Sequence, residues 1–238
     1  MRLGCDFVIV YGLRKPDSDL ASDRGQANAP PAFASRREPL VLLVVALVLL
    51  VVSAIGPKDR FTWWLEVAPI LLAVPVLLLT ALRFPLTPLA YRLIFVHALI
   101  LMLGGHYTYA EVPLGFWVRD LLGLARNHYD RLGHVAQGFV PAILVREVLR
   151  RKTPIVSRGW LFFLVTCVVL AISAAYELVE WVAAVTTGSA AMAFLGTQGD
   201  VWDTQWDMFL ALCGAIAAQL LLSRRHDREL LARGVRPL

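Results

Sequence analysis

The chain has 238 residues, of which 58% are hydrophobic and only 17% are charged. Soluble globular domains are about 45–50% apolar and about 25% charged, so the composition excludes an ordinary soluble enzyme, a disordered chain and a secreted disulfide scaffold. The net charge of +5 would suit a nucleic-acid partner in a soluble protein. Here the basic residues lie between apolar segments, which indicates that they set membrane topology and predicts no nucleic-acid partner.

The two ends of the chain are expected to lie outside the membrane. Residues 1–38 are polar and rich in proline, and their one short apolar stretch is followed by no small-residue cleavage site. This pattern predicts a flexible cytoplasmic tail rather than a signal peptide. A basic cytoplasmic tail is expected over residues 224–238, which leaves residues 39–223 as the membrane domain.

Six segments are long and apolar enough for spanning helices, which need about 20 mostly apolar residues. They cover residues 39–56, 63–82, 89–105, 132–149, 160–181 and 205–222. Of the 23 lysine and arginine residues, 18 fall on one side of this arrangement, and the positive-inside rule therefore places both termini in the cytoplasm. The predicted fold class is all-α, a polytopic transmembrane helical bundle. Residues 113–129 mix apolar and charged side chains, which predicts a short interfacial helix before the fourth span.

Ionisable residues gather at the outer, periplasm-facing ends of these spans. They come in pairs three or four residues apart, so each pair projects from one face of its helix. The pairs are Asp130 with His134, Glu177 with Glu180, and Asp203 with Asp207. Together they bring one histidine and five carboxylates to a single depth.

Clustered carboxylates repel one another unless a cation, a shared proton or an arginine relieves them. Carboxylate oxygen and imidazole are suitable ligands for Mg, Mn, Zn or Fe, so a divalent metal ion is the candidate cofactor. His134 or Glu180 is the candidate general base. The candidate metal ligands are His134, Glu177, Glu180, Asp203 and Asp207, with Asp130, Gln137 and Arg131 in supporting positions.

Simpler interpretations exist for the same residues. Single acids such as Glu66 and Glu111 fit charges at headgroup level that are exposed to water. Arginine–carboxylate pairs can lock helices together, and Asp203 fits the capping position of the last span. Trp202 and Trp206 are more typical of interfacial anchors than of ligand-binding groups.

Three sequence motifs carry a resemblance to a known family. They are His128-Tyr129-Asp130-Arg131-Leu132-Gly133-His134 followed by Gln137-Gly138-Phe139, then Tyr176-Glu177-Leu178-Val179-Glu180-Trp181, and the loop over residues 196–207 with Met208. From about residue 40 onward the chain resembles the YjdF-like family of bacterial inner-membrane proteins. The resemblance implies a multi-pass protein of the bacterial inner (cytoplasmic) membrane and brings no established activity.

A weaker likeness, in the order of the motifs alone, is to VanZ-like membrane proteins, which are linked to the cell envelope. It favours an envelope role by analogy. Three functional hypotheses follow. The first is cation-dependent binding or processing of a membrane lipid at the outer leaflet. The second is proton- or cation-coupled transport, for which six spans would form a thin scaffold unless the protein is a homo-oligomer. The third is a membrane scaffold without catalysis.

Overall fold

The computed structural model describes residues 37–188 and 192–238, and within these ranges every regular element is a helix and no strand occurs. The predicted tail over residues 1–38 lies almost wholly outside this part of the chain. In chain order the elements are α1 (Arg37–Ser53), α2 (Arg60–Thr80), α3 (Pro88–Tyr107), the 3-10 turn η1 (Tyr109–Glu111), α4 (Pro113–Leu122), α5 (Tyr129–Lys152), α6 (Arg158–Thr187), α7 (Met192–Leu195) and α8 (Asp203–Leu231).

Local sequence signals fix the starts of several helices. Asp59 caps α2, Thr87 caps α3 and Ser157 caps α6, each by accepting a hydrogen bond from the backbone N–H three residues later. Pro88 follows the cap of α3, a position where the missing N–H costs no helical hydrogen bond. These caps set the lengths of the spans that follow them.

Five helices of the described chain are long and apolar enough to cross a membrane, namely α2, α3, α5, α6 and α8. They correspond to the second to sixth predicted spans, and the all-α polytopic architecture is confirmed. The first predicted span corresponds to α1, which has 17 residues. That is about 25 Å of helix and lies at the lower limit for crossing the hydrocarbon core. The count of six spans and the cytoplasmic termini stay predictions.

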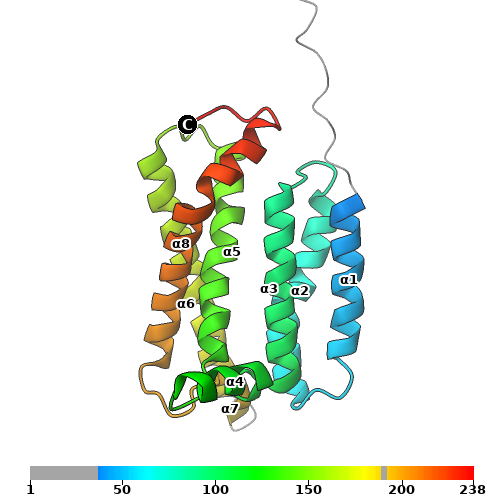
Figure 1. The fold of residues 1–238 in the computed structure, drawn as a ribbon, viewed down its shortest axis with the longest axis vertical. Coiled ribbons are helices and arrows are strands. Elements are labelled where there is room, and N and C mark those ends of the chain that lie inside the picture. The colour runs from blue at the N-terminus through cyan, green and yellow to red at the C-terminus, as the bar shows by residue number, and fades with distance from the viewer. Residues whose placement is uncertain (1–36, 189–191) are drawn as a thin grey trace, which may run out of the picture. The chain divides into compact units, whose positions relative to one another are not determined.

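Figure 1 shows α1, α2 and α3 grouped together and α5, α6 and α8 grouped beside them. The two groups are joined mainly by contacts between α3 and α5. We call the end of the bundle that carries α4 and α7 the outer end, and the opposite end the inner end, following the predicted orientation (Figure 1).

The most extensive helix contact is between α5 and α8, which lie side by side (Figure 1). A methyl group at Gly138 of α5 would overlap the backbone carbonyl of Ala211, and one at Gly214 of α8 would overlap that of Val135. The two backbones therefore touch, as small residues allow between membrane helices. This contact fixes the first turns of α5 and α8 relative to each other.

The short helix predicted before the fourth span is present as α4. It ends at Gly123, whose φ of 62° is the left-handed conformation that commonly closes a helix. Trp117, Leu121 and Leu122 are exposed on its surface. This apolar face suits the interfacial position that the sequence predicts.

The last helix extends further than the sequence indicated. α8 ends at Leu231, beyond the predicted end at residue 222, so the segment expected to be a basic tail over residues 224–238 begins inside a helix. His226 and Leu230 in this part of α8 are fully buried. His226 and Leu230 are one helical turn apart and therefore lie on one face of α8. Packing of this face against α5 explains the extension.

A buried ion network at the inner end joins α3, α5 and α8. Glu147 accepts hydrogen bonds from Thr87 Oγ1 at 2.7 Å and from His226 Nε2 at 3.2 Å. Arg146 donates to His226 Nδ1 at 3.0 Å and to Asp227 at 2.8 Å. We call Arg146, Glu147, His226 and Asp227 the inner network. No pattern in the sequence predicted this network.

Candidate functional site

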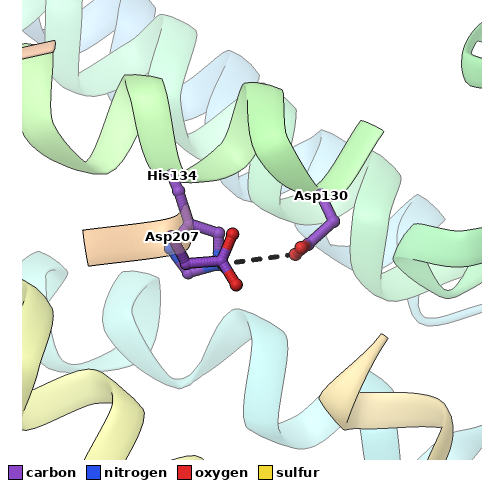
Figure 2. Close-up of side chains that lie close together, drawn as sticks. All are labelled: Asp130, His134 and Asp207. Atoms are coloured by element: carbon purple, nitrogen blue, oxygen red, sulfur yellow. Dashed lines mark ion pairs between the residues drawn. The ribbon is translucent and has the colours of Figure 1, made fainter. Parts of the chain in front are cut away.

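The first turns of α5 and α8 bring three of the predicted polar residues together at the outer end. Asp130 and His134 lie one turn apart on α5, and Asp207 reaches them from α8, with one ligand atom of each residue within 4.8 Å of the others. His134 Nε2 lies 3.5 Å from Asp130 Oδ1 and 3.8 Å from Asp207 Oδ2. Figure 2 shows Asp130 and His134 projecting from the same helix, with Asp207 beside the imidazole. We call these three residues the outer triad.

The imidazole of His134 is oriented by its neighbour Gln137. Nδ1 of His134 lies 2.9 Å from Oε1 of Gln137, and because an amide oxygen only accepts, Nδ1 carries a hydrogen and donates it there. Nε2 faces the carboxylates of Asp130 and Asp207. A neutral ring would offer its Nε2 lone pair to a cation bound between these groups, and a protonated ring would itself supply the positive charge.

The two separations from His134 within the outer triad suit a small metal ion. Ligand atoms around a tetrahedral zinc ion lie about 3.4 Å apart, as bonds of about 2.1 Å require. The distances from His134 Nε2 to the two aspartate oxygens, 3.5 and 3.8 Å, are close to this value. They are long for hydrogen bonds between a charged imidazole and a carboxylate.

A fourth predicted ligand, Glu177 of α6, lies beside the same imidazole, on its Nδ1 side. Its Oε1 lies 3.8 Å from Nδ1 of His134. Oε1 of Glu177 and Oδ1 of Asp207 are buried and have no hydrogen-bond partner among the described residues. The exposed fractions of these residues are only 7% for Glu177 and 2% for Asp207. Leaving such oxygens unpaired is costly, so both are available to a ligand.

Two further carboxylates surround the outer triad. Glu180 is half-buried one turn further along α6, and its charge interacts with those of Glu177 and His134. Glu66 on α2 is buried, with the hydroxyls of Tyr109 and Tyr176 facing it. The interpretation of Glu66 as a charge exposed to water is therefore wrong. α2 carries no second outer acid, so no spacing signal marked Glu66 in the sequence.

The remaining predicted ligand, Asp203, lies in an ion-pair network rather than in the outer triad. Arg126 contacts Asp203 at 3.2 Å and Asp200 at 3.1 Å. Arg131, a predicted supporting residue, pairs with Asp200 at 2.9 Å, and its guanidinium lies 5.3 Å from the ring centroid of Trp206. The interpretation of such pairs as a means of locking segments together holds for Asp203.

Two titratable groups outside the spans, His128 and Tyr109, are uncharged side chains of the outer end. Burial and the positive charges of Arg131 and Arg126 lower the pKa of His128, so its imidazole is uncharged at pH 7. Burial, with the charge of Glu66, raises the pKa of Tyr109 well above its usual range. Tyr109 is therefore a neutral phenol that can donate a hydrogen bond.

The helices, their apolar outward faces and the buried polar cluster define a multi-pass helical membrane protein. Residues 38–228 match the family described as "Predicted membrane protein (DUF2238)", and the chain belongs to this family. The chain is 55% identical over 196 residues to the inner membrane protein YjdF of Escherichia coli strain K12, a match covering 81% of this chain and 94% of that protein. No solved structure matches the chain.

These comparisons confirm two expectations from the sequence motifs. The YjdF-like resemblance reflects true membership of the family, and the bacterial inner-membrane location agrees with the relative in Escherichia coli. The motifs that suggested the family include all three residues of the outer triad.

Proposed function

We propose that the outer triad binds a divalent metal ion and that the protein uses it to bind or process an envelope lipid at the outer leaflet. The observation that carries this proposal is the orientation of His134. Its Nδ1–H is donated to Gln137, and its Nε2 lone pair faces Asp130 and Asp207. Histidine ligands of metals commonly donate their other ring N–H to an oxygen acceptor in this way.

Glu177 is the proposed fourth ligand, because its Oε1 is buried beside the His134 ring without a hydrogen-bond partner in the described chain; to bind the ion its side chain would move from the Nδ1 side of the ring to the Nε2 side. Asp203 is left out of the ligand set, since Arg126 pairs with it. A divalent ion held by carboxylates and imidazole can bind a phosphate-bearing headgroup or lower the pKa of a bound water. With His134 engaged as a ligand, Glu180 becomes the candidate general base.

Transport is supported less well by the arrangement of α5 and α8. Their backbones touch at Gly138 and Gly214, one to two turns from the outer triad toward the inner end. This contact leaves no space for an ion between these two helices. Secondary transporters bind their substrates near the membrane midplane, whereas the outer triad lies in the first turns of both helices.

Elemental analysis of the protein purified in a mild uncharged detergent tests the metal. We expect close to one divalent ion per chain in the wild type and its loss in Asp207→Asn. Asp203→Asn should keep the metal, because Asp203 lies outside the ligand set. Asp120→Asn is the matched control, since Asp120 is an exposed acid paired with Arg119 on α4.

Absence of metal from the wild type after incubation with Mn, Zn and Mg would overturn the metal proposal. The cation among His134, Asp130 and Asp207 would then be a proton, which would favour the transport hypothesis. Loss of thermal stability in Asp207→Asn from a wild type without metal would instead favour the scaffold hypothesis.

A further inference from the structure

A shallow apolar groove lies on the outer end of α8, beside the outer triad. It has a volume of about 450 Å³ and is lined by Trp202, Gln205, Trp206 and Phe209, which we call the aromatic groove. Trp206 and Phe209 meet edge to face, with ring centroids 5.9 Å apart. The lining residues are interspersed in the sequence with Asp203 and Asp207. The start of α8 therefore carries both the polar site and the aromatic surface.

A cationic group is positioned at the edge of the aromatic groove. The guanidinium of Arg131 lies 5.3 Å from the ring centroid of Trp206, and one of its terminal nitrogens pairs with Asp200. The Arg131 side chain keeps an exposed fraction of 27%, so part of the guanidinium is accessible at the surface. An accessible guanidinium is suited to a phosphate oxygen, because it donates charge-assisted hydrogen bonds in a planar fork.

We propose that the aromatic groove and Arg131 form the binding site for one membrane lipid with an anionic phosphate headgroup. The phosphate accepts a hydrogen bond from the accessible part of the Arg131 guanidinium, and the first part of an acyl chain lies on Trp206 and Phe209. This inference rests on the proposed function in one respect, because it names the lipid class that is brought beside the metal. It revises the expectation that Trp202 and Trp206 serve only as interfacial anchors.

Charge complementarity is the argument for this occupant. An apolar groove alone would accept any lipid tail, and a zwitterionic lipid gains little from a guanidinium because its own cation competes. An anionic headgroup can engage Arg131 without displacing Asp200, since Asp200 pairs with one terminal nitrogen and the side chain remains partly exposed. Arg131 is also adjacent in sequence to Asp130, which places a bound phosphate next to the outer triad.

The chain offers matched controls for both parts of the site. Trp160 and Phe163 form an equivalent edge-to-face pair, also with centroids 5.9 Å apart, at the inner end of α6. Arg119 lies over the ring of Phe116 and pairs with Asp120, at the outer end but away from the aromatic groove. Phe163→Ala therefore controls for Phe209→Ala, and Arg119→Gln controls for Arg131→Gln.

The test is native mass spectrometry of the full chain in uncharged detergent, with equal amounts of phosphatidylglycerol and phosphatidylcholine of the same acyl composition. We expect one phosphatidylglycerol to bind preferentially. Arg131→Gln should weaken this binding about 10- to 100-fold, as expected for a lost charge-assisted hydrogen bond. Phe209→Ala should weaken it about 5- to 10-fold through lost apolar contact. Neither control variant should change it more than about twofold.

Equal binding of the two lipids, or equal losses in the control variants, would overturn the lipid site. Glycerol phosphate is tested as a third ligand in the same experiment. If it binds as tightly as the lipid and Phe209→Ala has no effect, the site recognises a free phosphoester and the groove plays no part. Metal content measured on the same samples separates the two proposals. Lipid binding without metal contradicts only the metal centre, and metal without lipid binding that depends on Arg131 contradicts only this inference.

Discussion

His226 Nε2 lies 3.2 Å from a carboxylate oxygen of Glu147, and both side chains are fully buried. Because Arg146 can only donate, Nδ1 of His226 accepts its hydrogen bond. The neutral ring therefore donates through Nε2 and accepts through Nδ1, and both nitrogens are satisfied by protein groups. His134 differs in this respect, since its Nε2 faces two carboxylates and meets no donor. The contrast favours a structural role for the inner network and keeps the outer triad as the candidate ligand site.

Breaking the inner network should destabilise the protein without removing the metal. Glu147→Ala leaves His226 and Arg151 without the carboxylate that they share, and removing one partner of a buried ion pair costs about 3–5 kcal/mol. We expect a clearly lower melting temperature in detergent and an unchanged metal content per folded chain. Asp120→Asn removes an exposed pair and should change stability by about 0–1 kcal/mol. Equal melting temperatures for the two variants would contradict the structural role of Glu147.

The contact between α5 and α8 makes a second prediction. Gly138→Ala places a methyl group against the carbonyl of Ala211, and the helices must separate to admit it. Overpacking of this kind costs about 1–3 kcal/mol, so thermal unfolding should occur at a lower temperature. Gly159→Ala is the control, because its nearest neighbour is Ser157 Oγ at 4.0 Å. Alanine there should be neutral or slightly stabilising. An unchanged melting temperature in Gly138→Ala would show that the helices are further apart.

Much of this architecture follows from local sequence patterns. Apolar length marked the spans, and the i, i+4 spacing of Asp130 with His134 placed both on one face of α5. Asp207 could be joined to them because it occupies the same depth on a neighbouring span. The sequence does not predict that Asp207 joins the outer triad while Asp203 pairs with Arg126. That difference depends on Arg126, which lies 77 residues from Asp203 along the chain.

The inner network is a feature that the sequence did not predict. Glu147 sits at the end of a predicted span among basic residues, where a solvated surface is the ordinary expectation. Its partner His226 lies 79 residues away, in the segment expected to be a tail. One signal was present, because Leu230 follows His226 by one helical turn and continues the apolar face of α8. The mean hydropathy of this segment hides the signal, because arginines surround His226 and Leu230 and lower the mean.

The ion pairs of Arg126 should hold the loop over residues 196–202 in place beside the outer triad. Arg126 donates to the carbonyl of Thr197 and contacts Asp200 and Asp203. Arg126→Gln should therefore increase amide hydrogen exchange across this loop, because the loop loses its main side-chain anchor. Arg119→Gln, which breaks an exposed pair on α4, should leave the exchange unchanged. Equal protection in wild type and Arg126→Gln would show that the loop is held by other contacts, such as Gln198 to the carbonyl of Asn127.

Gln137 is expected to tune the metal rather than to bind it. Its side-chain oxygen accepts the Nδ1–H of His134 at 2.9 Å, which keeps the Nε2 lone pair directed at the outer triad. Loss of such an outer-shell partner typically weakens metal affinity 10- to 100-fold. Gln137→Ala should therefore bind the same number of metal ions at saturation, with a dissociation constant raised by about that factor in a competition titration against a chelator of known affinity.

Gln205→Ala is the matched control for this titration, because Gln205 lines the aromatic groove, whereas the residue that accepts the Nδ1–H of His134 is Gln137. Its metal affinity should equal that of the wild type. Gln137→Glu should retain or strengthen binding, since a carboxylate also accepts the Nδ1–H and raises the basicity of the ring. An identical affinity in Gln137→Ala and wild type would mean that His134 is not oriented through Nδ1. If Gln137→Ala instead bound fewer metal ions at saturation than the wild type, Gln137 would be a ligand.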